Sequence, residues 1–238
     1  WSDFKPGEIA RLPGYCQARM ARNLNSPEYQ IWLSRLGPDL LHTHHYCAGL
    51  IYLGRYYAKP PSRTSGDLTR ARENFRYMVE NAAPTYSLMP DVYLNLGEVE
   101  RFSGNTALAA SHYEKAISLD PRARRAYGLL ADMQRDQGDG VKALETVTEG
   151  LRRNPDAKTL QRRYRELGGK LPYPASAEPR VEAIAPAPQP SAPLQPSQAG
   201  NPPPAAPATP VAPAAAPVEP AKPGIGSPTN PYCRFCVD

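Results

Sequence analysis

Apolar and polar residues alternate with a helical period between residues 91 and 155, and the same pattern occurs there twice. When the sequence is shifted by 34 residues against itself, the matching pairs are Tyr93 and Tyr127, Leu96 and Leu130, Gly97 and Ala131, Gly104 and Gly138, Ala109 and Ala143, Tyr113 and Val147, Ala116 and Gly150, and Pro121 and Pro155. Each copy predicts an amphipathic helix, a turn at a glycine, and a second helix that ends before a proline. Because neither helix can bury its apolar face alone, the copies are expected to stack.

The spacing of these residues resembles that of the tetratricopeptide repeat family. The first copy has the small residue after a leucine (Gly97), the turn glycine (Gly104), the alanine (Ala109) and the aromatic residue (Tyr113) at that family's spacing. The second copy is looser, because valine and glycine replace the aromatic residue and the last alanine. The resemblance implies a helical solenoid in which the first helix of each pair lines a concave groove that binds extended peptides.

A more degraded third copy precedes these two. The residues that match the second helix of the next copy at a shift of 38 are Gly66, Ala71, Phe75 and Met78. This shift indicates four inserted residues between Ala83 and Leu88. The first helix of this copy is expected at residues 39–57, where either Ala48-Gly49 or Leu53-Gly54 makes the close helix contact.

The predicted fold is therefore all-α, a short solenoid of about three helix pairs with a helix at each end. Residues 26–36 read as a short helix, and residues 158–167 read as a helix that caps the stack. The expected segments are a helical extension (1–38), the solenoid with its cap (39–170), a Pro/Ala-rich linker or tail (171–231) and a terminal C-x-x-C anchor (232–238). Of the 29 prolines, 19 follow residue 171, so this tail has too little apolar mass to fold alone.

The family resemblance also suggests which residues line the groove. They are Asn95, Glu98, Arg101, Arg125, Asp132 and Arg135. If Arg125 is exposed there, its removal should leave the stability nearly unchanged. The Lys/Asn set with which some relatives clamp a terminal carboxylate is absent. The expected partners are other proteins or copies of the same chain.

Four cysteines suggest disulfides. Cys16 and Cys47 lie among apolar and aromatic residues, which favours a bond between them; the alternative is two buried free thiols. Cys233 and Cys236 form a C-x-x-C, either as a local disulfide or as an end that pairs with another chain. Redox catalysis is not favoured, because nothing nearby supplies the helix N-terminus that lowers a thiol pKa.

The segment HTHHYC concentrates possible metal ligands, namely His42, His44, His45 and Cys47. These residues could bind zinc or copper, because His42 and His45 would share a helix face, as would His44 and Cys47. No second ligand pair follows nearby, so packing and hydrogen bonding are the favoured roles. A metal-binding or redox accessory protein, built on this segment and the terminal C-x-x-C, remains the alternative function.

The net charge of +5 divides into −1 on the tail and +6 on the rest. The basic residues show little aromatic interleaving, so nucleic acid is not an expected partner. No nucleotide-binding loop or hydrolase motif occurs, which predicts a protein without catalysis or cofactor. No run of about 18 apolar residues predicts a membrane span.

Several features together suggest export. The chain begins at Trp1, its cysteines are even in number, and Pro/Ala tracts often bridge gaps in bacterial envelopes. The expected location is the periplasm or the extracellular space, with possible envelope association, against a cytosolic protein with free thiols. The tail is expected to dock on a neighbouring subunit or partner in a larger assembly, against a simple spacer.

Overall fold

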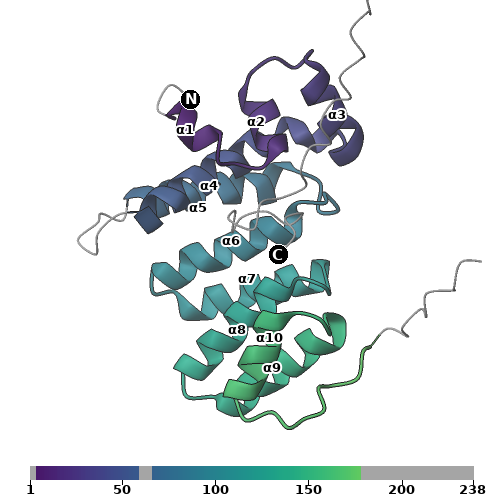
Figure 1. The fold of residues 1–238 in the computed structure, drawn as a ribbon. Coiled ribbons are helices and arrows are strands. Elements are labelled where there is room, and N and C mark those ends of the chain that lie inside the picture. Colours follow the sequence, from purple (N-terminus) through teal and green to yellow (C-terminus); the bar gives the residue numbers. More distant parts are fainter. Residues whose placement is uncertain (1–3, 59–65, 178–238) are drawn as a thin grey trace, which may run out of the picture. The chain divides into compact units, whose positions relative to one another are not determined.

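The described part of the chain, residues 4–58 and 66–177 of a computed structural model, consists of helices joined by loops (Figure 1). The helices are α1 (Pro6–Ile9), α2 (Gly14–Met20), α3 (Pro27–Leu36), the 3-10 helix η1 (Pro38–Leu41), α4 (Thr43–Ala58), α5 (Gly66–Asn81), α6 (Met89–Phe102), α7 (Thr106–Leu119), α8 (Arg124–Asp136), α9 (Gly140–Arg153) and α10 (Lys158–Glu166). These residues contain no strand, so the predicted all-α class is confirmed for them. Most of the Pro/Ala-rich tail and the terminal C-x-x-C lie outside the described residues.

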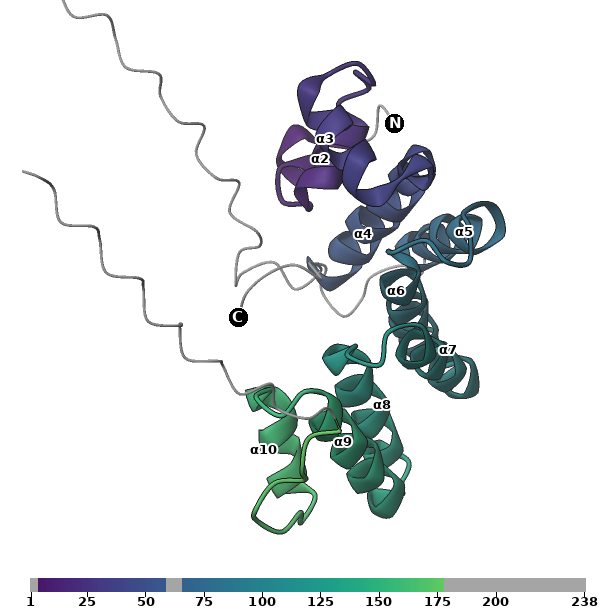
Figure 2. The same ribbon diagram turned by 90° about the vertical axis from the view of Figure 1, so that its right-hand side faces the viewer.

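Three helix pairs, α4 with α5, α6 with α7 and α8 with α9, follow one another in chain order as predicted (Figures 1 and 2). Adjacent pairs also touch, since α5 contacts α6 and α7 contacts α8. The turns inside the second and third pairs place Gly104 and Gly138 at φ angles of +83° and +86°. Glycine adopts this left-handed backbone without steric cost, which explains why both turns use it.

The first pair shows which glycine of α4 makes the close helix contact. A Cβ atom on Gly49 would lie 2.5 Å from the ring of Phe75, whereas one on Gly54 would meet nothing within 4 Å. The second pair repeats the contact, because a Cβ atom on Gly97 would overlap the ring of Tyr113. Gly49 is therefore the counterpart of Gly97, and it precedes Phe75 by 26 residues, against 16 between Gly97 and Tyr113.

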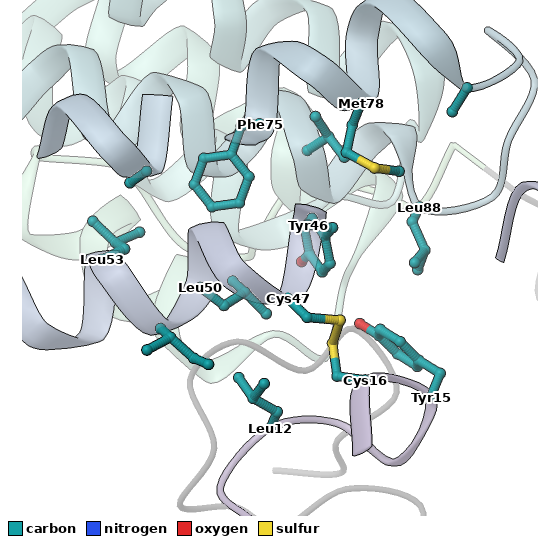
Figure 3. Close-up of a cluster of buried hydrophobic side chains, with 14 of the residues drawn as sticks. Leu12, Tyr15, Cys16, Tyr46, Cys47, Leu50, Leu53, Phe75, Met78 and Leu88 are labelled. Atoms are coloured by element: carbon teal, nitrogen blue, oxygen red, sulfur yellow. A yellow bond between two sulfur atoms is a disulfide. The ribbon is translucent and has the colours of Figure 1, made fainter. Parts of the chain in front are cut away.

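The N-terminal extension packs on the first pair through the largest group of buried apolar side chains. A disulfide joins Cys16 of α2 to Cys47 of α4, and both residues are fully buried (Figure 3). The apolar side chains around it include Leu12, Tyr15, Tyr46, Leu50, Leu53, Phe75, Met78 and Leu88. An ion pair adds a polar tie, with Arg55 Nε 2.6 Å from Glu8 Oε1, and the hydrogen bond from Arg55 lowers the pKa of Glu8 to about 2.

Helix α10 packs on α8 and α9 at the other end, in the place predicted for the capping helix. Its apolar side is buried through Leu160 and Tyr164. Its Arg163 reaches back to α8, where a Cβ atom on Gly128 would lie 3.3 Å from the guanidinium carbon. Glycine at that position therefore leaves room for the arginine.

In the ranges 4–58 and 66–177, none of the helices has both the length and the apolar character that crossing a membrane requires.

Candidate functional site

The polar residues that the family resemblance pointed to lie on α6 and α8, and with the end of α4 they form what is called here the first-helix face. Asn95 of α6 is only 1% exposed. Its side-chain amide donates to the Tyr46 hydroxyl at 3.2 Å and to the Asp91 carbonyl at 2.7 Å. Its Oδ1 accepts no hydrogen bond from any described residue. The prediction of an open groove position is therefore wrong for Asn95, which is buried and has an unused acceptor.

Glu98 joins three helices and is only 3% exposed. Its carboxylate accepts a hydrogen bond from the Tyr57 hydroxyl of α4 at 2.9 Å and another from Arg125 Nη2 of α8 at 2.5 Å. A buried carboxylate needs such donors in place of water. The prediction of an exposed groove position is therefore wrong for Glu98. Arg125 is not a free surface residue either, and its removal is expected to lower the stability.

Two donors near this carboxylate lack hydrogen-bond partners within the described ranges. They are Nε of Arg101 and the hydroxyl of the fully buried Tyr113. The Arg101 guanidinium lies over the ring of Phe102, 4.2 Å from its centre. Burial raises the pKa of Tyr113, so its hydroxyl keeps the proton. The first-helix face thus combines unused donors with the unused acceptor of Asn95.

Asp132 and Arg135 lie toward the C-terminal end of α8. Asp132 Oδ2 is 2.7 Å from Arg163 Nη2 of the capping helix, so this carboxylate is already paired. The Arg135 side chain is 49% exposed, and it contacts Asp136 at 3.0 Å on the surface. Among the six residues predicted to line the groove, Arg135 is the one that stands most open to solvent.

Three aromatic rings meet where α4 and α6 end, and they are called the aromatic cluster below. Tyr56 and Tyr57 come from α4, and Phe102 comes from α6. The ring centre of Phe102 lies 5.1 Å from that of Tyr56 and 5.3 Å from that of Tyr57. Tyr57 is 39% exposed, although its hydroxyl is bonded to Glu98. The cluster therefore offers aromatic surface beside the polar groups of α6.

The three histidines of HTHHYC each make a different contact. His45 stacks on Tyr77 of α5 with ring centres 3.6 Å apart, and His42 Nδ1 lies 3.3 Å from the Tyr77 hydroxyl. His44 Nδ1 lies 3.0 Å from Arg19 Nη2 in the N-terminal extension. Burial lowers the pKa of His44 to about 4, so it is neutral at pH 7. These side chains pack α4 against its neighbours.

No group of three or more His, Cys, Asp or Glu side chains in residues 4–58 and 66–177 is placed to hold a metal ion. The sulfur of Cys47 is bonded to Cys16 and cannot also ligate a metal in this state. Cys233 and Cys236 lie outside the described residues. Nothing in the described part of the chain therefore favours the metal-binding or redox alternative.

The comparison with known families bears on residues 103–167, a range from the end of α6 to the end of α10. The family model described as "Tetratricopeptide repeat" matches this range. The chain carries tetratricopeptide repeats. A solved structure similar to this chain is a thermophilic TPR protein from Thermus thermophilus, with a TM-score of 0.48 and 20% identity, over 64% of this chain and 86% of that one. No curated protein sequence matches the chain.

Two residues of the repeat array were not foreseen as parts of the site. Tyr57 reaches Glu98 of the next repeat, and Arg163 reaches Asp132 from the capping helix. The adjacent tyrosines at the end of α4 and the basic residues of α10 were visible signals. Their partners depend on the distance between neighbouring helices, which the periodicity of one helix does not contain.

Proposed function

We propose that the chain is a non-catalytic scaffold that binds protein partners through the first-helix face. Tetratricopeptide repeats generally mediate interactions between proteins. The observation that carries the proposal is the set of buried polar atoms without partners in the described residues, on Asn95, Arg101 and Tyr113. Buried polar groups are almost always hydrogen-bonded. An extended peptide supplies both N–H and C=O groups along its length, so it fits one unused acceptor and two unused donors.

The proposed location is the periplasm or the extracellular space. The disulfide between Cys16 and Cys47 supports it, because such bonds form in oxidising compartments and are rare in the cytosol. Peptide mapping without reductant on protein taken from its native source tests the location. Free thiols at both positions, after alkylation during extraction, would contradict both the bond and the export.

The scaffold is further proposed to act in a larger assembly, with its tail docked on a neighbouring copy or partner. A Pro-rich strand is already semi-extended and loses little entropy when it docks. About 60 residues at roughly 3.1 Å each reach up to about 180 Å, which is enough to pass one neighbour. Tyr232 and Phe235 with the C-x-x-C are the proposed anchor, because the distal half of the tail has no other aromatic or sulfur group.

The experiment that tests the binding face compares two double variants of the full chain. One carries Arg101→Ala and Arg135→Ala on the first-helix face. The control carries Arg152→Ala and Arg165→Ala, which are exposed arginines on α9 and α10. In a pull-down from the native source, the first variant should lose the partner and the control should keep it. Thermal melts verify that both variants fold.

Equal capture of the partner by the two folded variants would contradict the assignment of the face. A third protein, lacking residues 172–238, tests the tail separately. If it assembles and binds its partner as well as the intact chain does, the tail does not dock.

A further inference from the structure

The aromatic cluster of Tyr56, Tyr57 and Phe102 is an open group of rings on an otherwise polar face. The ring planes of Tyr57 and Phe102 meet at 82°, and those of Tyr56 and Phe102 at 47°, so the rings stand at angles to one another. Such an arrangement leaves ring faces available for a ligand that packs between them. The exposure of Tyr57 shows that the described residues do not cover this surface completely.

A hydrogen-bond donor lies at the edge of the same cluster. The Arg101 guanidinium rests on Phe102, and its Nε has no hydrogen-bond partner among the described residues. An aromatic surface beside an unused donor suits a polyproline II strand. Proline rings pack on aromatic rings, and the strand makes no internal hydrogen bonds, so its carbonyl groups are free to accept one.

Residues 186–223 of this chain have the composition that such a surface recognises. They combine proline with alanine and contain no aromatic residue, and their charged residues are Glu219 and Lys222. A nearly neutral segment gains little from ion pairs, so apolar packing and hydrogen bonds to its carbonyl groups would dominate its binding. This chemistry matches the aromatic cluster better than it matches the charged surface around Arg135.

We propose that the aromatic cluster binds the Pro-rich residues 186–223 of this chain. The inference rests on the proposed function, because it names the surface on which the tail docks. Six interhelix distances of about 8–10 Å separate α10 from α4 at most, or roughly 50–60 Å. About 23 extended residues after position 177 span roughly 70 Å, so a chain can reach its own cluster. The tether also raises the local concentration of the segment into the millimolar range.

The test is photo-crosslinking in the full chain, with Tyr57→p-benzoylphenylalanine as the probe. The control is Val141→p-benzoylphenylalanine, since Val141 lies on α9 and is 73% exposed. After irradiation, mass spectrometry maps the attachment points. The position-57 probe should attach mainly to residues 186–223, with a yield at least tenfold above that of the position-141 probe. Mixing ¹⁴N and ¹⁵N chains then separates attachment within one chain from attachment between two, and either result supports the binding.

Three outcomes would overturn the inference. They are equal yields from the two probes, attachment only outside residues 186–223, and attachment only to a foreign protein. A second variant adds Phe102→Ala to the position-57 probe, and it should lower the yield roughly two- to tenfold, which is the typical range for one aromatic pair. An unchanged yield contradicts the role of the cluster. If these tests fail while the Arg101→Ala and Arg135→Ala variant still loses the partner, the proposed function stands and only the tail site is wrong.

Discussion

One added methyl group should have opposite effects at two glycines of the same helix. Gly49 and Gly54 both lie within α4, and alanine is about 1 kcal/mol better than glycine in a helix interior. At Gly54 the new Cβ atom meets nothing within 4 Å, so Gly54→Ala should raise the free energy of unfolding by about 0.5–1 kcal/mol. At Gly49 it would lie 2.5 Å from the ring of Phe75, which is fully buried.

Because Phe75 cannot move aside without displacing its neighbours, Gly49→Ala overpacks the core. Overpacking costs about 1–3 kcal/mol, and the gain in helix propensity offsets part of it. The propensity gain is common to both variants, so their unfolding free energies should differ by about 1–3 kcal/mol, with Gly49→Ala the less stable.

Urea unfolding followed by circular dichroism, with the disulfide intact, measures this difference. The slope against urea should be the same in both proteins, so that the midpoints report stability alone. If both variants gain the same stability, helices α4 and α5 do not approach closely at Gly49, and the alignment of the first repeat is wrong.

Four further outcomes are expected. Ala109→Leu should destabilise by about 1–3 kcal/mol, because Ala109 is fully buried between helices, and thermal melts measure it. Replacing Cys16 and Cys47 with serine should cost about 3–4 kcal/mol in the chain-entropy account, measured by urea unfolding, and an unchanged midpoint would speak against the bond. The lowered pKa of His44, about 4, means that the unfolded chain takes up a proton that the folded one refuses. Stability should therefore fall as the pH drops from about 6.5 to 4, and His44→Gln should flatten the profile. Arg125→Ala should cost about 1–3 kcal/mol in a thermal melt, because it leaves the buried Glu98 carboxylate without its charged donor.

The repeat pattern predicted the helix pairs because it records what each helix must bury. The shift of 34 residues placed Gly97 opposite Tyr113, and the structure shows that contact. The first repeat stayed ambiguous because its loop is longer, so the spacing could not choose between Gly49 and Gly54. Only the position of the Phe75 ring decides the choice.

The candidate site was less predictable. A position on the first helix can be assigned to a face from its number alone, but its exposure depends on what neighbouring helices bring to it. Glu98 is buried because Tyr57 and Arg125 approach it from two other helices. Such contacts span 41 and 27 residues of sequence, and no local pattern encodes them.

The covalent tie between α2 and α4 also gives the stack a direction in which it comes apart. In an array whose units contact only their neighbours, opening begins at the less secured end. The N-terminal end is held by the largest buried group and by the bond from Cys16 to Cys47. The C-terminal end depends on a smaller group around Leu160 and Tyr164. Fraying should therefore start at α10 and move inward, so amide hydrogens of α9 and α10 exchange with solvent sooner than those of α4.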